Sequence, residues 1–201
     1  MKTTLDILLE KQVMAYQSAQ TRKNHRAAIA SSAIAGALLA LPFLGAAPVL
    51  AAPKQIPDIL KVPPGNVLLL QADGRGTQKY ACPVSATSNA VPHAILRVGR
   101  HEGDLVAIHF AGPTWEALDG SSVVGDGAKA KHFTAPDPDG VDWLLLPAKS
   151  TTGNGAFSRV SFIQRLFTDG GKPPAAGCQP GQTEVLVEYS AQYFFYVPAA
   201  R

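Results

Sequence analysis

Residues 185–197, VLVEYSAQYFFYV, give the clearest indication of the fold. Every odd-numbered position of this run is apolar or aromatic. Side chains of a β-strand point alternately to its two faces, so this alternation predicts a long strand with one buried face. Phe194 and Tyr196 interrupt the other face, which predicts that this end is covered on both sides. The polar residues of that other face are Glu188, Ser190 and Gln192.

The chain before this strand consists of short apolar runs separated by Gly, Pro, Asp and Asn. No stretch after residue 52 has a 3.6-residue period, so we expect no substantial helix. Asp73-Gly74-Arg75-Gly76 is typical of a hairpin turn between two of the runs. The pattern predicts an all-β single-domain sandwich or barrel. Its other expected strands are residues 66–72, 77–82, 94–98, 105–111, 114–118, 122–125, 128–133, 143–148 and 157–168.

The first 51 residues resemble a targeting segment rather than part of the fold. Basic residues at 22–26 precede an apolar run at 27–41 and a small-residue stretch at 45–52, which is typical of a secretory signal peptide. We expect cleavage after Ala51. Met14 is an alternative start to Met1, and a membrane anchor over residues 27–52 is the alternative to a removable signal.

The predicted order is therefore an N-terminal extension with signal peptide (1–51), an extended lead-in (52–65) and the all-β domain (66–201). Five of the 18 lysines and arginines lie in the leader, against two of the 15 acids. The remainder has thirteen charges of each sign. The formal charge of +3 thus belongs to the leader and gives no support to nucleic-acid binding.

Both cysteines, Cys82 and Cys178, follow the leader. An exported chain meets an oxidising environment, and the two residues do not form a C-x-x-C motif. We therefore predict one disulfide, which on the chain-entropy model stabilises the fold by about 4 to 5 kcal/mol.

Residues 109–125, HFAGPTWEALDGSSVVG, carry the densest set of candidate binding residues. The Gly112-Pro113 break displays Trp115 and Glu116 near a bend. If Val106, Ile108 and Phe110 face the core, then His109 lies on the opposite face with Leu105 and Ala107. Each aromatic has a plainer interpretation: His109 as a half-exposed strand residue, and Trp115 as a core or rim residue.

Gln164 is a further candidate, because alternation places it on the same face as Val160, Phe162 and Leu166. A buried amide needs hydrogen-bond partners, either in the neighbouring backbone or in a ligand. Arg165 is then expected to face outward. The candidate ligand-binding set is His109, Trp115, Glu116 and Gln164.

A hydrolase is the alternative class. A glycosidase needs two carboxyl groups on either side of a sugar, and Glu116, Asp119 and Asp142 are the candidates. Asp119 precedes Gly120 and is equally explained as a turn former. Ser121 and Ser122 lack the G-x-S-x-G motif that would support a serine hydrolase.

Metal-binding patterns are weak. Asp137, Asp139 and Asp142 resemble the first half of a calcium loop, but the closing glutamate is missing. His93, His101, His109 and His132 show no zinc-binding spacing. We therefore predict no metal and no cofactor.

Four motifs together resemble a family of secreted bacterial and fungal proteins catalogued as a domain of unknown function. The motifs are VPPGN (62–66), HFAGPTWEALDGSSVVG (109–125), WLLLPA (143–148) and FIQRLFTDGGKPPAAGC (162–178). The resemblance implies export and adds no activity. Some fungal members are labelled dehydrogenases, but Gly74-x-Gly76 is followed by Lys79 where a dinucleotide fingerprint has glycine.

These observations predict an exported binding or structural module of the cell envelope or extracellular space, rather than an enzyme. The expected partner is a small molecule or a glycan, with no nucleic acid and no stable membrane span once the signal is removed. The alternative is a secreted glycosidase-like hydrolase that uses Glu116 or Asp119. The sequence does not indicate an oligomeric state.

Overall fold

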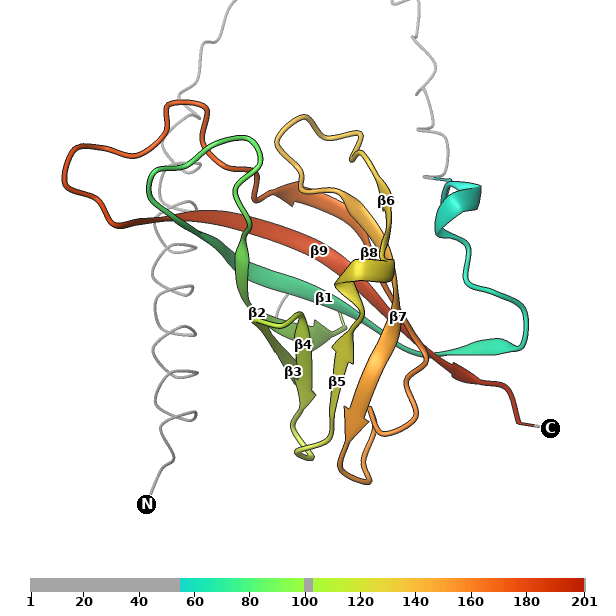
Figure 1. Ribbon diagram of the computed structural model, residues 1–201. Coiled ribbons are helices and arrows are strands. Elements are labelled where there is room, and N and C mark those ends of the chain that lie inside the picture. The colour runs from blue at the N-terminus through green and yellow to red at the C-terminus, as the bar shows by residue number, and fades with distance from the viewer. Residues whose placement is uncertain (1–54, 100–102, 201) are drawn as a thin grey trace, which may run out of the picture. The chain divides into compact units, whose positions relative to one another are not determined.

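The computed structural model describes residues 55–99 and 103–200, and strands dominate this part of the chain (Figure 1). The predicted leader and His101 lie outside the described residues. Two short 3-10 helices accompany the strands, η1 (Asp58–Leu60) and η2 (Gly127–Lys129). The strands are β1 (Asn66–Ala81), β2 (Val91–Val98), β3 (Asp104–Phe110), β4 (Thr114–Ala117), β5 (Ser122–Gly125), β6 (Lys131–Phe133), β7 (Trp143–Thr152), β8 (Phe162–Gly170) and β9 (Glu184–Pro198).

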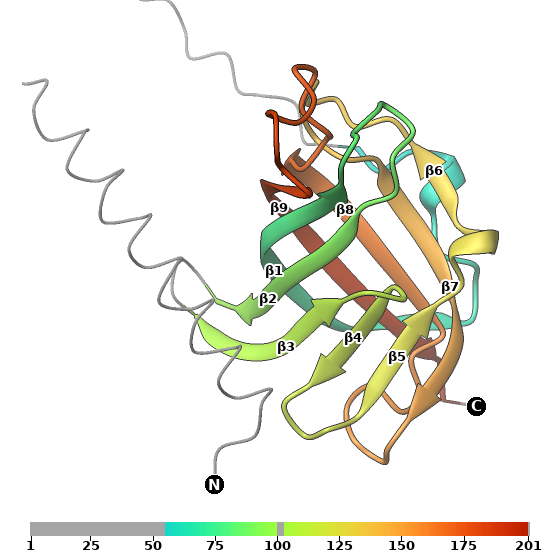
Figure 2. The ribbon, with the colours of Figure 1, turned by 60° about the vertical axis from the view of Figure 1, so that its left-hand side comes forward.

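All nine strands belong to one antiparallel sheet that closes on itself. Its order is β5-β4-β3-β2-β1-β9-β8-β7-β6, and β5 also pairs with β7. Eight strands therefore form a barrel, and β6 lies beside the first part of β7 (Figure 2). The all-β prediction is confirmed, and the architecture is a barrel rather than a sandwich. Within the described ranges, no helix has the length and hydropathy needed to cross a bilayer.

The hairpin turn predicted at residues 73–76 is wrong, because β1 runs through it without interruption. Both glycines instead allow close approach. A Cβ on Gly74 would lie 2.4 Å from the ring of Tyr193, and a Cβ on Gly76 would lie 1.9 Å from the carbonyl oxygen of His93. Glycine inside a strand commonly marks such a contact, and here it lets a large ring and a neighbouring strand lie against β1.

The barrel interior is packed with aromatic and small side chains in alternation. Trp115, Tyr193, Phe157 and Phe195 are at most 2% exposed. Alanines from β1, β2, β3 and β9 share this core and leave room for the rings. Small residues opposite large ones fill the narrow interior of an eight-stranded barrel.

A second apolar cluster lies on the outer face of β7 and β8, under the segment that precedes β1. Leu60 from η1 is fully buried there with Trp143, Leu145 and Leu166. The described part of the predicted lead-in, residues 55–65, therefore covers a face of the sheet. Phe194 packs against the same cluster. This confirms the prediction that the end of this strand is covered on both sides.

Two predicted strands are shorter than expected by several residues. Residues 128–133 divide between η2 and β6, and the run from 157 begins with a turn, so that β8 starts at Phe162. Phe157 is nevertheless fully buried in the barrel core. Its apolar character therefore reflects burial in the core rather than a strand conformation.

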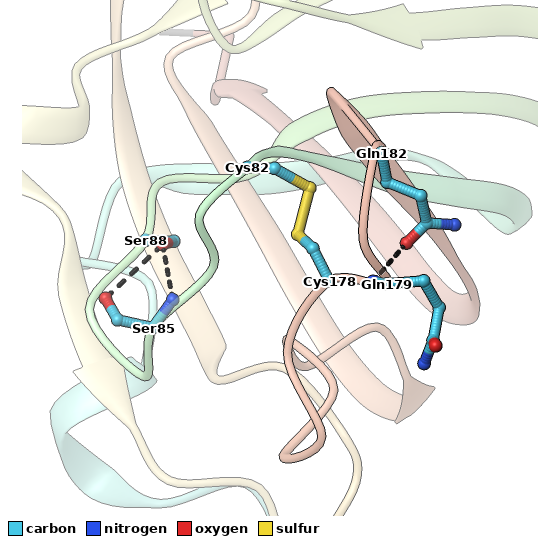
Figure 3. The surroundings of a disulfide bond; sticks show 6 residues. All are labelled: Cys82, Ser85, Ser88, Cys178, Gln179 and Gln182. Carbon is cyan, nitrogen blue, oxygen red and sulfur yellow. Dashed lines mark hydrogen bonds between the residues drawn. A yellow bond between two sulfur atoms is a disulfide. The ribbon is translucent and has the colours of Figure 1, made fainter.

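Cys82 and Cys178 form the predicted disulfide, with their Cα atoms 6.1 Å apart (Figure 3). Cys82 directly follows β1, and Cys178 lies in the loop between β8 and β9. The bond joins two long loops at the same end of the barrel (Figure 1). Within these loops, backbone–side-chain hydrogen bonds from Ser85 to Ser88 and from Gln179 to Gln182 form local turns.

Candidate functional site

A cavity of about 320 Å³ lies at one end of the barrel. It is bounded by the last part of β1, the start of β2, the β3–β4 turn, and the segments around β6 and β7. This is the end of the barrel at which Cys82 follows β1. The apolar part of its wall includes Val91, Pro113, Ala130, Val141, Leu144 and Leu146.

The β3–β4 hairpin supplies two aromatic residues of the wall. His109 and Trp115 are directly paired across the two strands, and their rings stack with centroids 4.2 Å apart and an interplanar angle of 1°. The buried residues of β3 are Ala107 and His109, so the inward face is the reverse of the one assumed for Val106, Ile108 and Phe110. His109 is 3% exposed and is therefore not a half-exposed strand residue.

The hydrogen bond of His109 fixes the form of its imidazole. Nδ1 lies 2.8 Å from the carbonyl oxygen of Thr114, and a carbonyl can only accept, so Nδ1 carries the hydrogen. Burial lowers the pKa of His109 to about 3, partly opposed by this hydrogen bond. At neutral pH His109 is therefore an uncharged ring with a proton on Nδ1.

Tyr193 links this stack to the rest of the core. Its ring meets His109 and Trp115 edge-on, at centroid distances of 5.5 and 5.8 Å. Its hydroxyl lies 3.1 Å from that of Tyr189. Burial raises the pKa of both phenols, and the positive charge of Arg165 opposes the shift. Tyr193 thus packs behind the stacked rings of His109 and Trp115.

Arg165 places a positive charge at the cavity. It lies on β8 two residues after the buried Ile163, so it faces the barrel interior rather than the outside as the sequence suggested. Its Nε and Nη2 donate to the carbonyl oxygen of Asp142 at 3.1 and 2.9 Å. Within the described ranges Arg165 forms no ion pair with a carboxylate.

Two residues of the cavity wall carry a buried side-chain donor that has no protein partner. Gln78 is 1% exposed and Trp115 is 2% exposed, and both line the cavity. Gln78 Nε2 and Trp115 Nε1 form no hydrogen bond within the described part of the chain. Buried donors of this kind are rare, and each one needs an explanation. A third such nitrogen, Trp143 Nε1, belongs to the outer cluster.

The structure brings only part of the predicted ligand-binding set together. His109 and Trp115 share the cavity, whereas Glu116 lies on the opposite face of β4 from the buried Trp115 and Ala117. Gln164 lies on the outer face of β8. Its Nε2 donates to the carbonyl oxygen of Leu60 at 2.7 Å, and its Oε1 accepts from the hydroxyl of Tyr196 at 2.9 Å. Gln164 therefore holds the lead-in against the barrel.

Asp119 has a structural role that its surroundings explain fully. Its carboxylate accepts from the backbone N–H and the hydroxyl of Ser121 at 2.9 and 2.6 Å, and from the N–H of Ala156 at 2.7 Å. The hydrogen bond from the Ser121 hydroxyl, together with those from the N–H groups of Ala156 and Ser121, lowers the pKa of Asp119. A general acid needs the opposite shift. Asp119 joins the β4–β5 turn to the loop after β7.

The predicted calcium candidates form a turn. Asp137 Oδ1 accepts from the backbone N–H groups of Asp139 and Gly140, at 2.8 and 3.2 Å. Asp142 Oδ2 lies 3.5 Å from Nδ1 of His132. Among the described residues, no three His, Cys, Asp or Glu side chains gather in a way that could hold a metal ion.

Sequence reasoning missed Gln78 and Arg165. Residues 77–82 alone do not mark Gln78 as buried, because the predicted turn at 73–76 separates them from the rest of the alternation of β1. Arg165 was assigned outward because the face that carries Gln164 and Leu166 is itself apolar. Both faces of β8 are covered, so its pattern of apolar residues does not identify the inner one.

These features define a class of protein: a small closed β-barrel with one disulfide and an aromatic-walled cavity at one end. Within that class, a family model described as "Protein of unknown function (DUF3455)" matches residues 96–197, about half of the chain, and the protein belongs to this family. The match includes His109, Trp115 and Arg165 and begins after Gln78 and Cys82. Searches of curated proteins and of solved structures found no match.

Proposed function

We propose that this protein is an exported binding protein that holds a small molecule in the cavity at the end of its barrel. The observation that carries the proposal is the pair of buried donors, Gln78 Nε2 and Trp115 Nε1, in the wall of an otherwise mainly apolar cavity. A cavity of about 320 Å³ is within the range of ligand pockets, which are mostly apolar with a few convergent polar groups.

A binding role is better supported than hydrolysis. No aspartate or glutamate is among the described residues that line this cavity. Glu116 faces away from it, and Asp119 is engaged by three donors in a turn. A glycosidase needs two carboxyl groups at one site, and this cavity supplies neither.

A pair of loop variants tests the proposal. Ala90 lines the cavity, and Ala86 is exposed in the same loop away from it. Ala90→Trp should obstruct the cavity, whereas Ala86→Trp places the same bulk on the surface. A panel of small apolar and amphipathic compounds is added to each protein, and the melting temperature is measured. A ligand at a hundred times its Kd stabilises a protein by about 2.7 kcal/mol.

We expect at least one compound to raise the melting temperature of the native protein and of Ala86→Trp, but not of Ala90→Trp. Equal stabilisation of all three proteins would place binding elsewhere. Release of product from a polysaccharide panel, lost in Glu116→Gln, would favour the hydrolase instead.

Export is the second part of the proposal, and it rests on the basic and apolar pattern of residues 1–51 together with the disulfide. Mass spectrometry of the protein recovered from outside the cytoplasm should give a chain that begins at Ala52. A chain that retains residues 27–51 would support a membrane anchor.

A further inference from the structure

Three side chains of the cavity wall offer N–H groups, beside the acceptor Nε2 of the neutral His109. Gln78 Nε2 and Trp115 Nε1 are unpartnered N–H donors, and Arg165 brings a guanidinium to the same wall. A ligand that satisfies them must present hydrogen-bond acceptors. Neutral hydroxyl or amine groups would accept hydrogen bonds from the donors but would not balance the positive charge of Arg165.

The charge of Arg165 is not neutralised by the neighbouring protein. Its Nε and Nη2 donate to the carbonyl oxygen of Asp142, and its side chain also hydrogen-bonds the Tyr193 hydroxyl; neither partner carries a formal charge. The carboxylate of Asp142 instead lies beside His132, at 3.5 Å. His132 also lines the cavity, so the two ionisable side chains at its wall besides the neutral His109 are both basic.

We infer that the cavity takes a small carboxylic acid with an apolar body, and that Gln78, Trp115 and Arg165 bind the carboxylate. The inference rests on the proposed binding function and specifies its ligand class. A planar carboxylate offers two oxygens that can accept from several N–H groups at once, and guanidinium groups bind it in this way. Apolar side chains such as Leu144 and Leu146 cover the remainder of the molecule.

The first test compares acids with their own amides, because the two differ in charge and little in shape. The probes are phenylacetate, hydrocinnamate, indoleacetate and octanoate, each beside its primary amide, measured by calorimetric titration at pH 7.5. At least one acid should bind at least about tenfold more tightly than its amide, since a hydrogen bond to a charged group contributes about 1.5 to 3 kcal/mol, and 1.4 kcal/mol is tenfold.

Two variants assign this preference to residues. Arg165→Gln should weaken binding of the acid by at least about tenfold and leave the amide within about threefold. Arg159→Gln is the matched control, because Arg159 is exposed and lies outside the cavity wall. Gln78→Met should weaken acid binding by about three- to tenfold without lowering the melting temperature of the free protein, because Nε2 has no protein partner to lose.

The outcomes separate the two proposals. If the amides bind as tightly as the acids, or if Arg165→Gln keeps the preference for the acid, the carboxylate inference is overturned and the cavity remains a binding site. If no probe binds and Ala90→Trp has no effect on any compound of the wider panel, both proposals fail. The comparison of acids with amides uses the native protein, so it is decisive even if Arg165→Gln does not fold.

Discussion

His109 is a neutral imidazole in a place where few polar side chains are tolerated. Its ring stacks on Trp115, and its Nδ1 hydrogen satisfies the carbonyl of Thr114. Protonation would place a charge in the packed interior of the barrel, close enough to Arg165 for that residue to lower its pKa further. The arrangement therefore links the stability of the barrel to pH.

We predict that the free energy of unfolding falls as pH falls from 6.5 toward 3. The unfolded chain binds a proton at His109 near pH 6.5, whereas burial lowers the pKa of the folded residue to about 3. The unfolded state therefore holds more protons in this window, and stability decreases by about 1.4 kcal/mol per pH unit. Urea denaturation at pH 6.5 and 4.5 should differ by roughly 2 to 3 kcal/mol from this residue.

His109→Phe is the comparison for this prediction. Phenylalanine keeps an aromatic ring beside Trp115 but cannot bind a proton. Other groups, such as the carboxylate of Asp119, titrate alike in both proteins, so the difference between their two pH dependences reports on His109. Parallel pH dependences would contradict the lowered pKa.

At the scale of elements, η1 makes the lead-in part of the folded structure. Leu60 is fully buried on the outer face of the barrel, whereas the adjacent Ile59 is 51% exposed. We predict that Leu60→Ala lowers the free energy of unfolding by about 2 to 5 kcal/mol, as for other leucines removed from cores. Ile59→Ala is the control and should change it by less than about 1 kcal/mol. Chemical denaturation measures both, and equal losses would mean that the lead-in is not firmly packed.

The two glycines of β1 give the second prediction at this scale. Gly76→Ala would bring a Cβ to 1.9 Å from the carbonyl oxygen of His93 on β2, so the two strands must separate. A Cβ on Gly127 meets nothing within 4 Å. We therefore expect Gly76→Ala to lower the melting temperature by several degrees and Gly127→Ala to leave it nearly unchanged. An unaffected Gly76→Ala protein would favour a turn at residues 73–76.

The same elements show how far the sequence defines the fold. Period-two alternation in β9 and the short runs before it correctly predicted an all-β chain, and β5 has the predicted bounds. Alternation cannot say which face is inward when both are covered, and for this reason Arg165 was assigned to the wrong side. A Gly-x-Gly pair likewise fits either a turn or a close contact between strands. The partner that distinguishes the two, here Tyr193 or β2, is distant in sequence.

The candidate site was only partly predictable for the same physical reason. His109 and Trp115 are six residues apart on one hairpin, so local reasoning could bring them together. Gln78 and Arg165 lie on β1 and β8, and these strands reach the same wall because both pair with β9. No local pattern shows that these two side chains share a cavity.

At the scale of the whole molecule, the disulfide connects stability with the proposed site. The two cysteines are separated by 96 positions, and the loop that begins at Cys82 ends at Ala90 in the cavity wall. We predict that replacing both cysteines by serine lowers the free energy of unfolding by about 2 to 5 kcal/mol. Ligands found with the native protein should also bind more weakly to this variant. Native affinity in the serine variant would show that the loop is positioned without the bond.

Closure of the sheet also bears on how the protein avoids aggregation. A strand with an unpaired edge can recruit a strand from another molecule, and a barrel removes most such edges. The start of β1 is an exception, because its pairing with β2 begins at Asp73, and Val67, Leu68 and Leu69 before it are exposed. The register of β1 against β9 is irregular between Leu68 and Leu70. A bulge of this kind disrupts the regular edge that an added strand would need. The exposed start of β1 is therefore a poor template for aggregation.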